Sequence, residues 1–259
     1  MKKFELTAES KINIFGKKLF RIKALISFGD VEEGETGGWI EKEENLEQSS
    51  GDAWVYGDAE VYGNARVYGN ARVSGNAEVY GNAWVYGDAG VSGDAGVSGD
   101  ARVYGNARVY GNAEVYGNAW VSGDAGVSGD AGVSGDARVY GNAWVYGDAG
   151  VSGNAEVSGD ARVYGNARVY GNAEVSGNAE VYDNADYTTI HGFGTQFRTT
   201  TFFQCEDKQI RVSCGCFLGT IPEFREQVKN TRKGKIAEEY LMIADLMEKH
   251  FVKEKESGE

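Results

Sequence analysis

The most regular feature of the chain is a six-residue alternation of small, apolar and polar positions between Gly51 and Tyr182. The motif Gly-(Asn/Asp)-Ala-x-Val-(Tyr/Ser) occurs 22 times in this stretch without a gap. In an extended strand, side chains alternate between two sides, so Ala and Val share one side while x and Tyr/Ser share the other. Because Ala and Val never vary, we expect them to face an interior, with the Gly-(Asn/Asp) pair forming a bend between strands.

Three such strands and three bends close a triangular coil of 18 residues, and the repeats predict a rod of about seven coils. The motif resembles that of the left-handed parallel β-helix of hexapeptide-repeat proteins, where an aliphatic residue precedes a small one by four positions, as with Val55 and Ala59. The resemblance implies a mainly β fold and packing as a homo-oligomer, typically a trimer.

Residues 1–50 are predicted to form a β cap, because the end of a solenoid exposes unpaired strand edges. Two apolar runs flank residues 15–18 and predict a β-hairpin. Ile40 and Leu46 lie six residues apart, so the repeat register is expected to begin before Gly51, with a three-residue insertion at residues 48–50. The inward positions of the hairpin are predicted to be Ile12, Ile14, Phe20 and Ile22.

Residues 183–259 lack the repeat and predict a small α+β domain, with strands over 197–204 and 209–218. Thr220 and Glu223 form a capping-box sequence before a helix expected over 221–231. A second helix is expected over 235–252. Its apolar face is predicted to comprise Ile236, Tyr240, Ile243, Leu246 and Met247.

Every third repeat belongs to the same face, and one face alternates Arg and Trp at x beside a column of Tyr. Neighbours about 4.8 Å apart can form a cation–π ladder within the chain. The same residue types dominate protein interfaces, so a surface for a protein partner is the alternative prediction. We call this set the Arg–Trp–Tyr ridge; it comprises Arg66, Trp84, Arg102, Trp120, Arg138, Tyr68, Tyr86, Tyr104 and Tyr140.

The other two faces carry repeats in which x is Gly and the last position is Ser. Gly on a strand often marks the close approach of another chain, so these patches are either subunit contacts or plain surface. They are Gly90/Ser92, Gly96/Ser98, Gly126/Ser128, Gly132/Ser134 and Gly150/Ser152.

The bends carry a further alternation of Asp and Asn, as in Asp52, Asn70, Asp88 and Asn106 at one corner. This arrangement places carboxylates two coils apart and reduces their repulsion, which predicts a structural device. A ladder of metal sites and acidic mimicry of nucleic acid are the alternatives.

The formal net charge of −13 disfavours binding to nucleic-acid phosphates. No signal peptide or membrane-spanning segment is recognised, and three Cys without a disulfide framework suit a reducing compartment, so a cytoplasmic location is expected. Arg198 and the three Thr after it could hold an anion. A zinc site is the alternative to buried thiols for Cys205, Cys214, Cys216, His191 and His250, but the spacing is poor, and neither a metal nor a cofactor is predicted.

The resemblance to hexapeptide-repeat proteins raises acyltransferase activity, which needs a His base and cations for coenzyme A. The repeats contain no His and no Lys, so no catalytic residue is predicted. The flanks, with FGDVEEGETGGWIEKEENL before the repeats and CGCFLGT after them, resemble uncharacterised bacteriophage and prophage proteins. The sequence thus predicts a non-enzymatic binding or scaffold protein for a host or phage protein, such as a host-defence inhibitor. A virion spacer is the alternative, and an acyltransferase is disfavoured.

Overall fold

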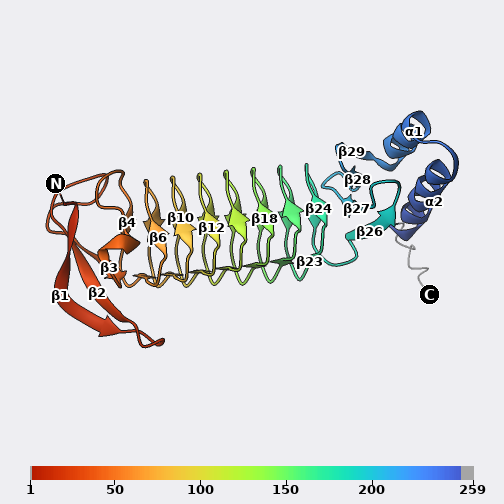
Figure 1. Ribbon diagram of the computed structural model, residues 1–259. Coiled ribbons are helices and arrows are strands. Elements are labelled where there is room, and N and C mark those ends of the chain that lie inside the picture. Colours follow the sequence, from red (N-terminus) through yellow and green to blue (C-terminus); the bar gives the residue numbers. More distant parts are fainter. Residues whose placement is uncertain (1, 252–259) are drawn as a thin grey trace.

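The computed structural model describes residues 2–251 and shows a straight rod with a different cap at each end (Figure 1). A β-hairpin lies at the N-terminal end, and a four-stranded sheet with two helices lies at the C-terminal end. The predicted residues 252–259, including the end of the second helix at Val252, lie outside the described part. None of the described helices is long and apolar enough to cross a lipid bilayer.

The rod is a parallel β-solenoid in which each repeat contributes a two-residue strand to one of three sheets. The first face consists of β6 (Arg66–Val67), β9 (Trp84–Val85), β12 (Arg102–Val103), β15 (Trp120–Val121), β18 (Arg138–Val139), β21 (Glu156–Val157) and β24 (Glu174–Val175). The second consists of β5 (Glu60–Val61), β8 (Glu78–Val79), β11 (Gly96–Val97), β14 (Glu114–Val115), β17 (Gly132–Val133), β20 (Gly150–Val151) and β23 (Arg168–Val169). The third consists of β4 (Trp54–Val55), β7 (Arg72–Val73), β10 (Gly90–Val91), β13 (Arg108–Val109), β16 (Gly126–Val127), β19 (Trp144–Val145), β22 (Arg162–Val163) and β25 (Glu180–Val181).

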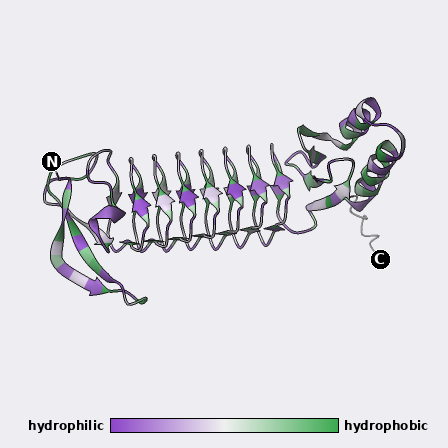
Figure 2. Cartoon of the chain, in the orientation of Figure 1, coloured by the Kyte–Doolittle hydropathy of each residue, from purple (hydrophilic) through white to green (hydrophobic). Residues whose placement is uncertain are grey.

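The predicted interior is confirmed, because every repeat Ala and Val side chain is at most 1% exposed. The predicted bends are also confirmed, since the repeat glycines have φ between 61° and 74°. Successive turns are in register at a spacing of 18 residues, as in the pairing of Arg102 with Trp84 and with Trp120. Apolar side chains thus fill the axis, while the variable positions alternate in hydropathy along the outside (Figure 2).

The solenoid begins before the perfect repeats, as Ile40 and Leu46 predict. Strand β3 (Thr36–Ile40) joins the second face by pairing Ile40 with Val61, and Leu46 forms a bridge with Val67 on the first face. A 3₁₀ helix, η1 (Glu43–Asn45), connects these two segments. Each face therefore has eight levels, one more than the predicted seven, because the N-terminal segment supplies an additional turn.

The bends are connected by hydrogen bonds between side chains of successive turns. The amide Nδ2 of Asn70 donates to Oδ1 of Asp88 at 2.9 Å, and that of Asn106 donates to Asp124 at 2.7 Å. The Asn/Asp alternation therefore supplies a donor beneath each accepting carboxylate, besides separating like charges. The predicted structural device is confirmed, and it is a pairwise bond rather than spacing alone.

One corner departs from this pattern, because Asp130 and Asp148 occupy successive levels. We expect Asp130→Asn to stabilise the protein by about 0.5–1 kcal/mol, since it removes a like-charge contact and supplies an amide donor for Asp148. Asp94→Asn is the matched control, because Asp94 lies between Asn76 and Asn112 and has no carboxylate one turn away. Chemical denaturation would measure both; equal midpoints for the two variants would contradict the prediction.

The N-terminal cap is a hairpin of β1 (Phe4–Ile12) and β2 (Lys18–Ala24), which pairs with β3. The hairpin was predicted correctly, but its inward positions were partly wrong. Ile12 and Ile14 are 73% and 87% exposed because they lie at the tip, beyond the rod, whereas Ile22 is fully buried. Leu19 is buried in place of the half-exposed Phe20 because the β2–β3 pairing is irregular after Arg21.

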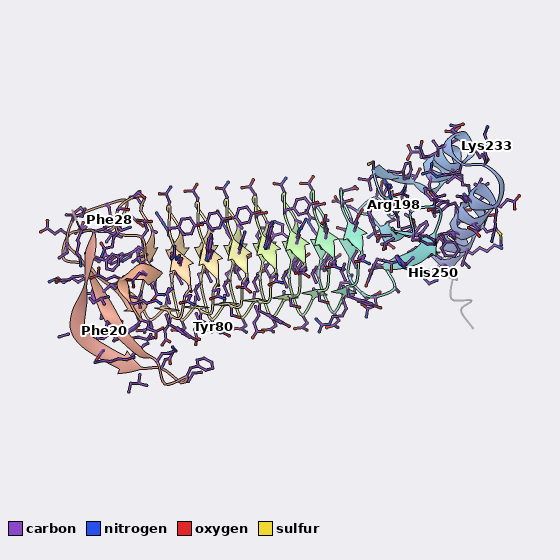
Figure 3. All side chains as sticks on the ribbon, in the orientation of Figure 1. Phe20, Phe28, Tyr80, Arg198, Lys233 and His250 are labelled. Carbon is purple, nitrogen blue, oxygen red and sulfur yellow. The ribbon has the colours of Figure 1, made fainter. Side chains whose placement is uncertain are left out.

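Trp54 occupies an outward x position of the first repeat, yet its side chain is fully buried. The rings of Phe4 and Phe28 pack edge-on against it, with centroid separations of 6.1 and 5.4 Å. Phe28 lies at this capped end of the rod (Figure 3). Trp54 therefore joins the axial core because the cap covers the first level of the third face.

The C-terminal cap is an antiparallel sheet of β26 (Tyr187–Phe193), β27 (Arg198–Gln204), β28 (Ile210–Cys214) and β29 (Phe217–Thr220). Alternate residues of β27 serve two cores, because Phe203 packs on the end of the solenoid whereas Phe202 packs against the helices. The Thr201 hydroxyl accepts a hydrogen bond from the backbone N–H of Glu174 at 2.9 Å. The C-terminal sheet thus closes the solenoid as well as supporting the helices.

Two helices cover the far side of this sheet: α1 (Ile221–Thr231) and α2 (Gly234–His250). The capping box of Thr220 and Glu223 is confirmed, with both reciprocal hydrogen bonds present. The predicted apolar face of α2 is confirmed for Tyr240, Ile243 and Met247, but Leu246 is 58% exposed, and Ala244 is buried in its place. The contact with α1 and β26 is therefore rotated slightly about the α2 axis.

Candidate functional site

The centre of the Arg–Trp–Tyr ridge is a sandwich of one guanidinium group between two indole rings. Arg102 lies 5.3 Å from the ring centroid of Trp84 and 5.2 Å from that of Trp120. Arg138 lies 5.2 Å from Trp120 on its other side. The predicted cation–π ladder is therefore confirmed from Trp84 to Arg138. Arg66 forms no such contact in the described structure.

The tyrosines of the ridge form a second column beside this ladder. The rings of Tyr68, Tyr86 and Tyr104 are stacked within 3° of parallel, with centroids 4.8 and 4.9 Å apart. Ser122 interrupts the column, so Tyr140 stands apart and its hydroxyl donates to Glu156 at 3.2 Å. The ridge thus divides into a continuous aromatic part from Tyr68 to Trp120 and a separate end where Arg138 also pairs with Glu156 at 3.4 Å.

Mutual stacking orders these side chains without covering them. Trp84 is 37% exposed, Arg66 and Arg138 are exposed, and the remaining ridge side chains between them are half-buried. Each ring contacts its neighbours through one face or edge and leaves another edge toward solvent. The ridge therefore combines accessibility with little rotamer freedom, which lowers the entropic cost of binding a partner.

The N-terminal end of the ridge opens into a groove of about 550 Å³. Arg66, Tyr68 and Trp84 form one wall, and the acidic segment around η1 forms the other, with Glu44 and Glu47. The sequence did not predict this groove, because it depends on the turn that residues 43–48 add below the first perfect repeats.

The Gly/Ser patches divide into two kinds. Gly126 is covered by the Trp144 ring, and Gly150 by Arg168, so a Cβ atom at either position would lie within 2.7 Å of that side chain. These two glycines accommodate large side chains of the same protein. In contrast, a Cβ at Gly90, Gly96 or Gly132 would meet nothing within 4 Å, so these positions are open surface.

The residues weighed as zinc ligands are dispersed. Cys205 is buried at the end of the solenoid, where burial raises the pKa of its thiol to about 11. Cys214 is half-buried, but Cys216 is exposed, which contradicts the prediction that both lie in a core on one strand. A turn at Gly215 and Cys216 separates β28 from β29, so the predicted strand over 209–218 is interrupted. Within residues 2–251, no group of three or more His, Cys, Asp or Glu side chains could hold a metal ion.

The stacked tyrosines predict a loss of stability at alkaline pH. Burial raises the pKa of Tyr68 and Tyr86 above the usual value near 10, and it raises the pKa of Tyr187 to about 12. These phenols ionise more readily in the unfolded chain, so their contribution is complete below pH ~10 and is lost as the pH rises toward 12. Denaturant midpoints should fall between pH 9 and 11.5, expressed as about two pH units around the unfolded pKa. Tyr187→Phe, which removes a phenol that donates to the Arg168 carbonyl, should flatten the fall; a pH-independent midpoint would refute the link.

The three parallel sheets and the repeated turns define a β-helix repeat protein. The repeats are similar to a protein family described as the YdcK beta solenoid repeat. The matched segments are residues 59–75, 65–81, 71–87, 95–111, 101–117, 107–123, 131–147 and 161–177. No curated protein matches the chain. The similarity thus concerns the solenoid and leaves both caps outside the matched segments.

Proposed function

We propose that this chain is a non-enzymatic binding protein of phage or prophage type, which presents its solenoid surface to a protein partner in the bacterial cytoplasm. The observation that carries the proposal is the preordered, accessible sandwich of Arg102 between Trp84 and Trp120. Trp, Tyr and Arg are the residue types most enriched among interface hot spots. The phage-like flanking sequences support a partner in the host cell, such as a component of a defence system.

Charge indicates which partner surface fits the ridge. Arg102 has no carboxylate within ion-pair distance in the described structure, whereas Arg138 pairs with Glu156. The chain as a whole carries a net charge of −13, so Arg102 is a local cation on an acidic protein. A partner carboxylate flanked by apolar groups would pair with the guanidinium and cover both indole rings.

The ridge proposal can be tested by affinity capture from bacterial lysate followed by quantitative mass spectrometry. Trp84→Ala combined with Trp120→Ala, and separately Arg102→Glu, should each reduce capture of the partner at least about tenfold. Trp144→Ala and Arg108→Glu are matched controls, because both residues are outward x positions on the third face. Equal capture by the ridge variants and the controls, with all proteins folded by circular dichroism, would refute the ridge as the binding surface.

We further propose a homo-oligomer, a trimer by resemblance to hexapeptide-repeat proteins. The open surface at Gly90, Gly96 and Gly132 supports this proposal, because two backbones can approach closely where no side chain intervenes. Light scattering should give three times the monomer mass of 28.0 kDa, and Gly96→Arg with Gly132→Arg should reduce it. A monomeric wild-type protein would refute the oligomer without affecting the ridge.

A virion spacer remains the second candidate, because the rod is straight and free of insertions. Mass spectrometry of purified particles would distinguish the candidates, since a spacer is present in stoichiometric amount. Acyl transfer is less well supported, because the repeats supply neither a His base nor Lys.

A further inference from the structure

A cleft in the C-terminal cap is chemically unlike the rest of this acidic protein. It has a volume of about 760 Å³ and lies between the sheet and the two helices. Its lining includes Arg198, Arg232 and Lys233, together with uncharged polar and apolar side chains, and it includes no Asp or Glu. A cleft of this size is typical of sites for small organic ligands.

The two arginines of the cleft differ from the other arginines of the cap. Arg211 pairs with Asp207 at 2.6 Å, and Arg225 pairs with Asp245 at 2.7 Å. Arg198 and Arg232 form no ion pair with any described carboxylate, and Arg232 donates only to the neighbouring carbonyl of Thr231 at 3.2 Å. Their hydrogen-bond donors are therefore free for an external anion.

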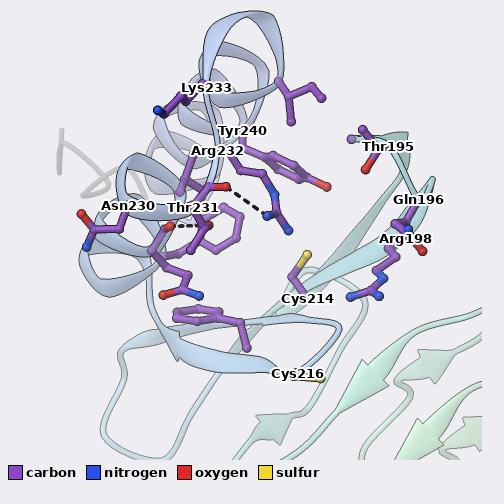
Figure 4. A pocket seen from close by; sticks show the side chains of 16 residues that line it. Thr195, Gln196, Arg198, Cys214, Cys216, Asn230, Thr231, Arg232, Lys233 and Tyr240 are labelled. Atoms are coloured by element: carbon purple, nitrogen blue, oxygen red, sulfur yellow. Dashed lines mark hydrogen bonds between the residues drawn. The ribbon is translucent and has the colours of Figure 1, made fainter.

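The guanidinium groups of Arg198 and Arg232 enter the cleft from opposite sides, with Cys214 between them (Figure 4). The Tyr240 side chain also points into this space, whereas the ammonium group of Lys233 is directed away from it (Figure 4). Arg198 comes from the sheet and Arg232 from the segment between α1 and α2, so the fold brings together two cations 34 residues apart. Two converging guanidinium groups match the geometry of a phosphate or carboxylate.

The backbone beside Arg198 supports a functional role for this arrangement. Phe197 has φ of 48°, which is unfavourable for a bulky residue, and its side chain is 65% exposed, so core packing does not explain the conformation. Gly215 lacks the Cβ atom that would collide with the Arg198 guanidinium. Both features allow Arg198 to occupy the rim of the cleft.

The opposite part of the lining is apolar. Phe217, Phe224 and Ile236 contribute to it, and Phe217 and Phe224 contact each other with centroids 5.5 Å apart. We propose that this cleft binds a small organic anion, in which a phosphate or carboxylate group pairs with Arg198 and Arg232 and an apolar body contacts the phenylalanines. This site lies in the C-terminal cap, beyond the last strand of the ridge face, and does not depend on the ridge (Figure 1).

The test uses the full chain with phenyl phosphate, benzoate and inorganic phosphate as probes. Calorimetry measures binding, and the rate at which iodoacetamide alkylates Cys214 reports occupancy, with Cys216→Ser removing the other accessible thiol. We expect phenyl phosphate or benzoate to bind and to slow alkylation, and inorganic phosphate to bind more weakly than phenyl phosphate. Tighter binding of phenyl phosphate than of benzoate would identify the natural group as a phosphate, and the reverse order would identify a carboxylate.

Arg198→Gln and Arg232→Gln should each weaken binding at least about tenfold, because each removes charge-assisted hydrogen bonds. Lys229→Gln is the matched control, since it removes one positive charge from exposed α1 surface outside the cleft. Absence of binding by all three probes up to about 10 mM would overturn the proposal, and so would undiminished protection of Cys214 in both arginine variants. Equal binding of phenyl phosphate and inorganic phosphate would overturn the apolar part of the site.

Discussion

Gly135→Ala is expected to destabilise the protein by about 2–5 kcal/mol, the sum of a backbone cost and a steric cost. Gly135 has φ of 68°, where an L-residue with a Cβ atom loses about 1–2 kcal/mol. The added Cβ would also lie 3.0 Å from the backbone N of Gly153 and 3.1 Å from its carbonyl O in the next turn. That turn is hydrogen-bonded on both sides, as by Asp136 N–H to the Gly153 carbonyl at 2.8 Å, so it yields little.

Gly171→Ala separates these two costs. Gly171 occupies the same corner of the triangle and has φ of 72°, but a Cβ there would meet nothing within 4 Å. It should therefore show only the backbone cost of about 1–2 kcal/mol. Denaturant unfolding followed by circular dichroism measures both variants. If Gly171→Ala were as damaging as Gly135→Ala, the contact between turns would not explain why glycine is invariant in the repeat.

The solenoid could be predicted from the sequence because a single local rule is repeated 22 times. The invariant Ala and Val define the interior, and the spacing of 18 residues fixes which side chains are neighbours on a face. Those two facts predicted the contact of Arg102 with Trp84 and Trp120 before any coordinates were considered. A long repeat leaves few alternative registers, so pattern and structure agree here.

The caps could not be predicted to the same depth, because their contacts depend on segments that are distant in sequence. Trp54 has the pattern of an outward residue and becomes buried only because Phe4 and Phe28 fold over it. Cys216 has the pattern of an inward strand residue, but the turn at Gly215 places it in solvent. Each residue obeys its local period until a tertiary contact or a turn overrides it.

The binding cleft of the C-terminal cap shows the same limit. Arg198 stood out in the sequence as a candidate anion ligand, but Arg232 did not. It lies between two helices and carries no pattern of its own. Only the packing of α1 and α2 against the sheet brings it opposite Arg198 (Figure 4). A signal in the sequence was nevertheless present, because residues 229–235 hold five Lys or Arg and no acidic residue.

Trp54→Ala is expected to destabilise the protein by about 3–5 kcal/mol, the range for removing a fully buried aromatic side chain. The indole lies among Phe4, Phe28 and Ile22, and Gly37 lacks the Cβ atom that would occupy the same space. Its loss would leave a cavity between the cap and the first turn. Because each turn contacts only its neighbours, a loosened cap also exposes the strand edges of the first level to fraying and to pairing with other molecules.

Trp144→Ala is the matched control, because Trp144 occupies the same repeat position on the same face but is half-exposed. It packs over Gly126 and against Tyr110, and its removal should cost no more than about 1–2 kcal/mol. Thermal unfolding would give the stability difference, and hydrogen exchange should show lost protection confined to the first turns in the Trp54 variant. Similar stabilities for the two variants, or lost protection spread evenly along the rod, would show that the N-terminal segment is an appendage. A large, localised effect would show that residues far outside the repeats determine where the solenoid begins.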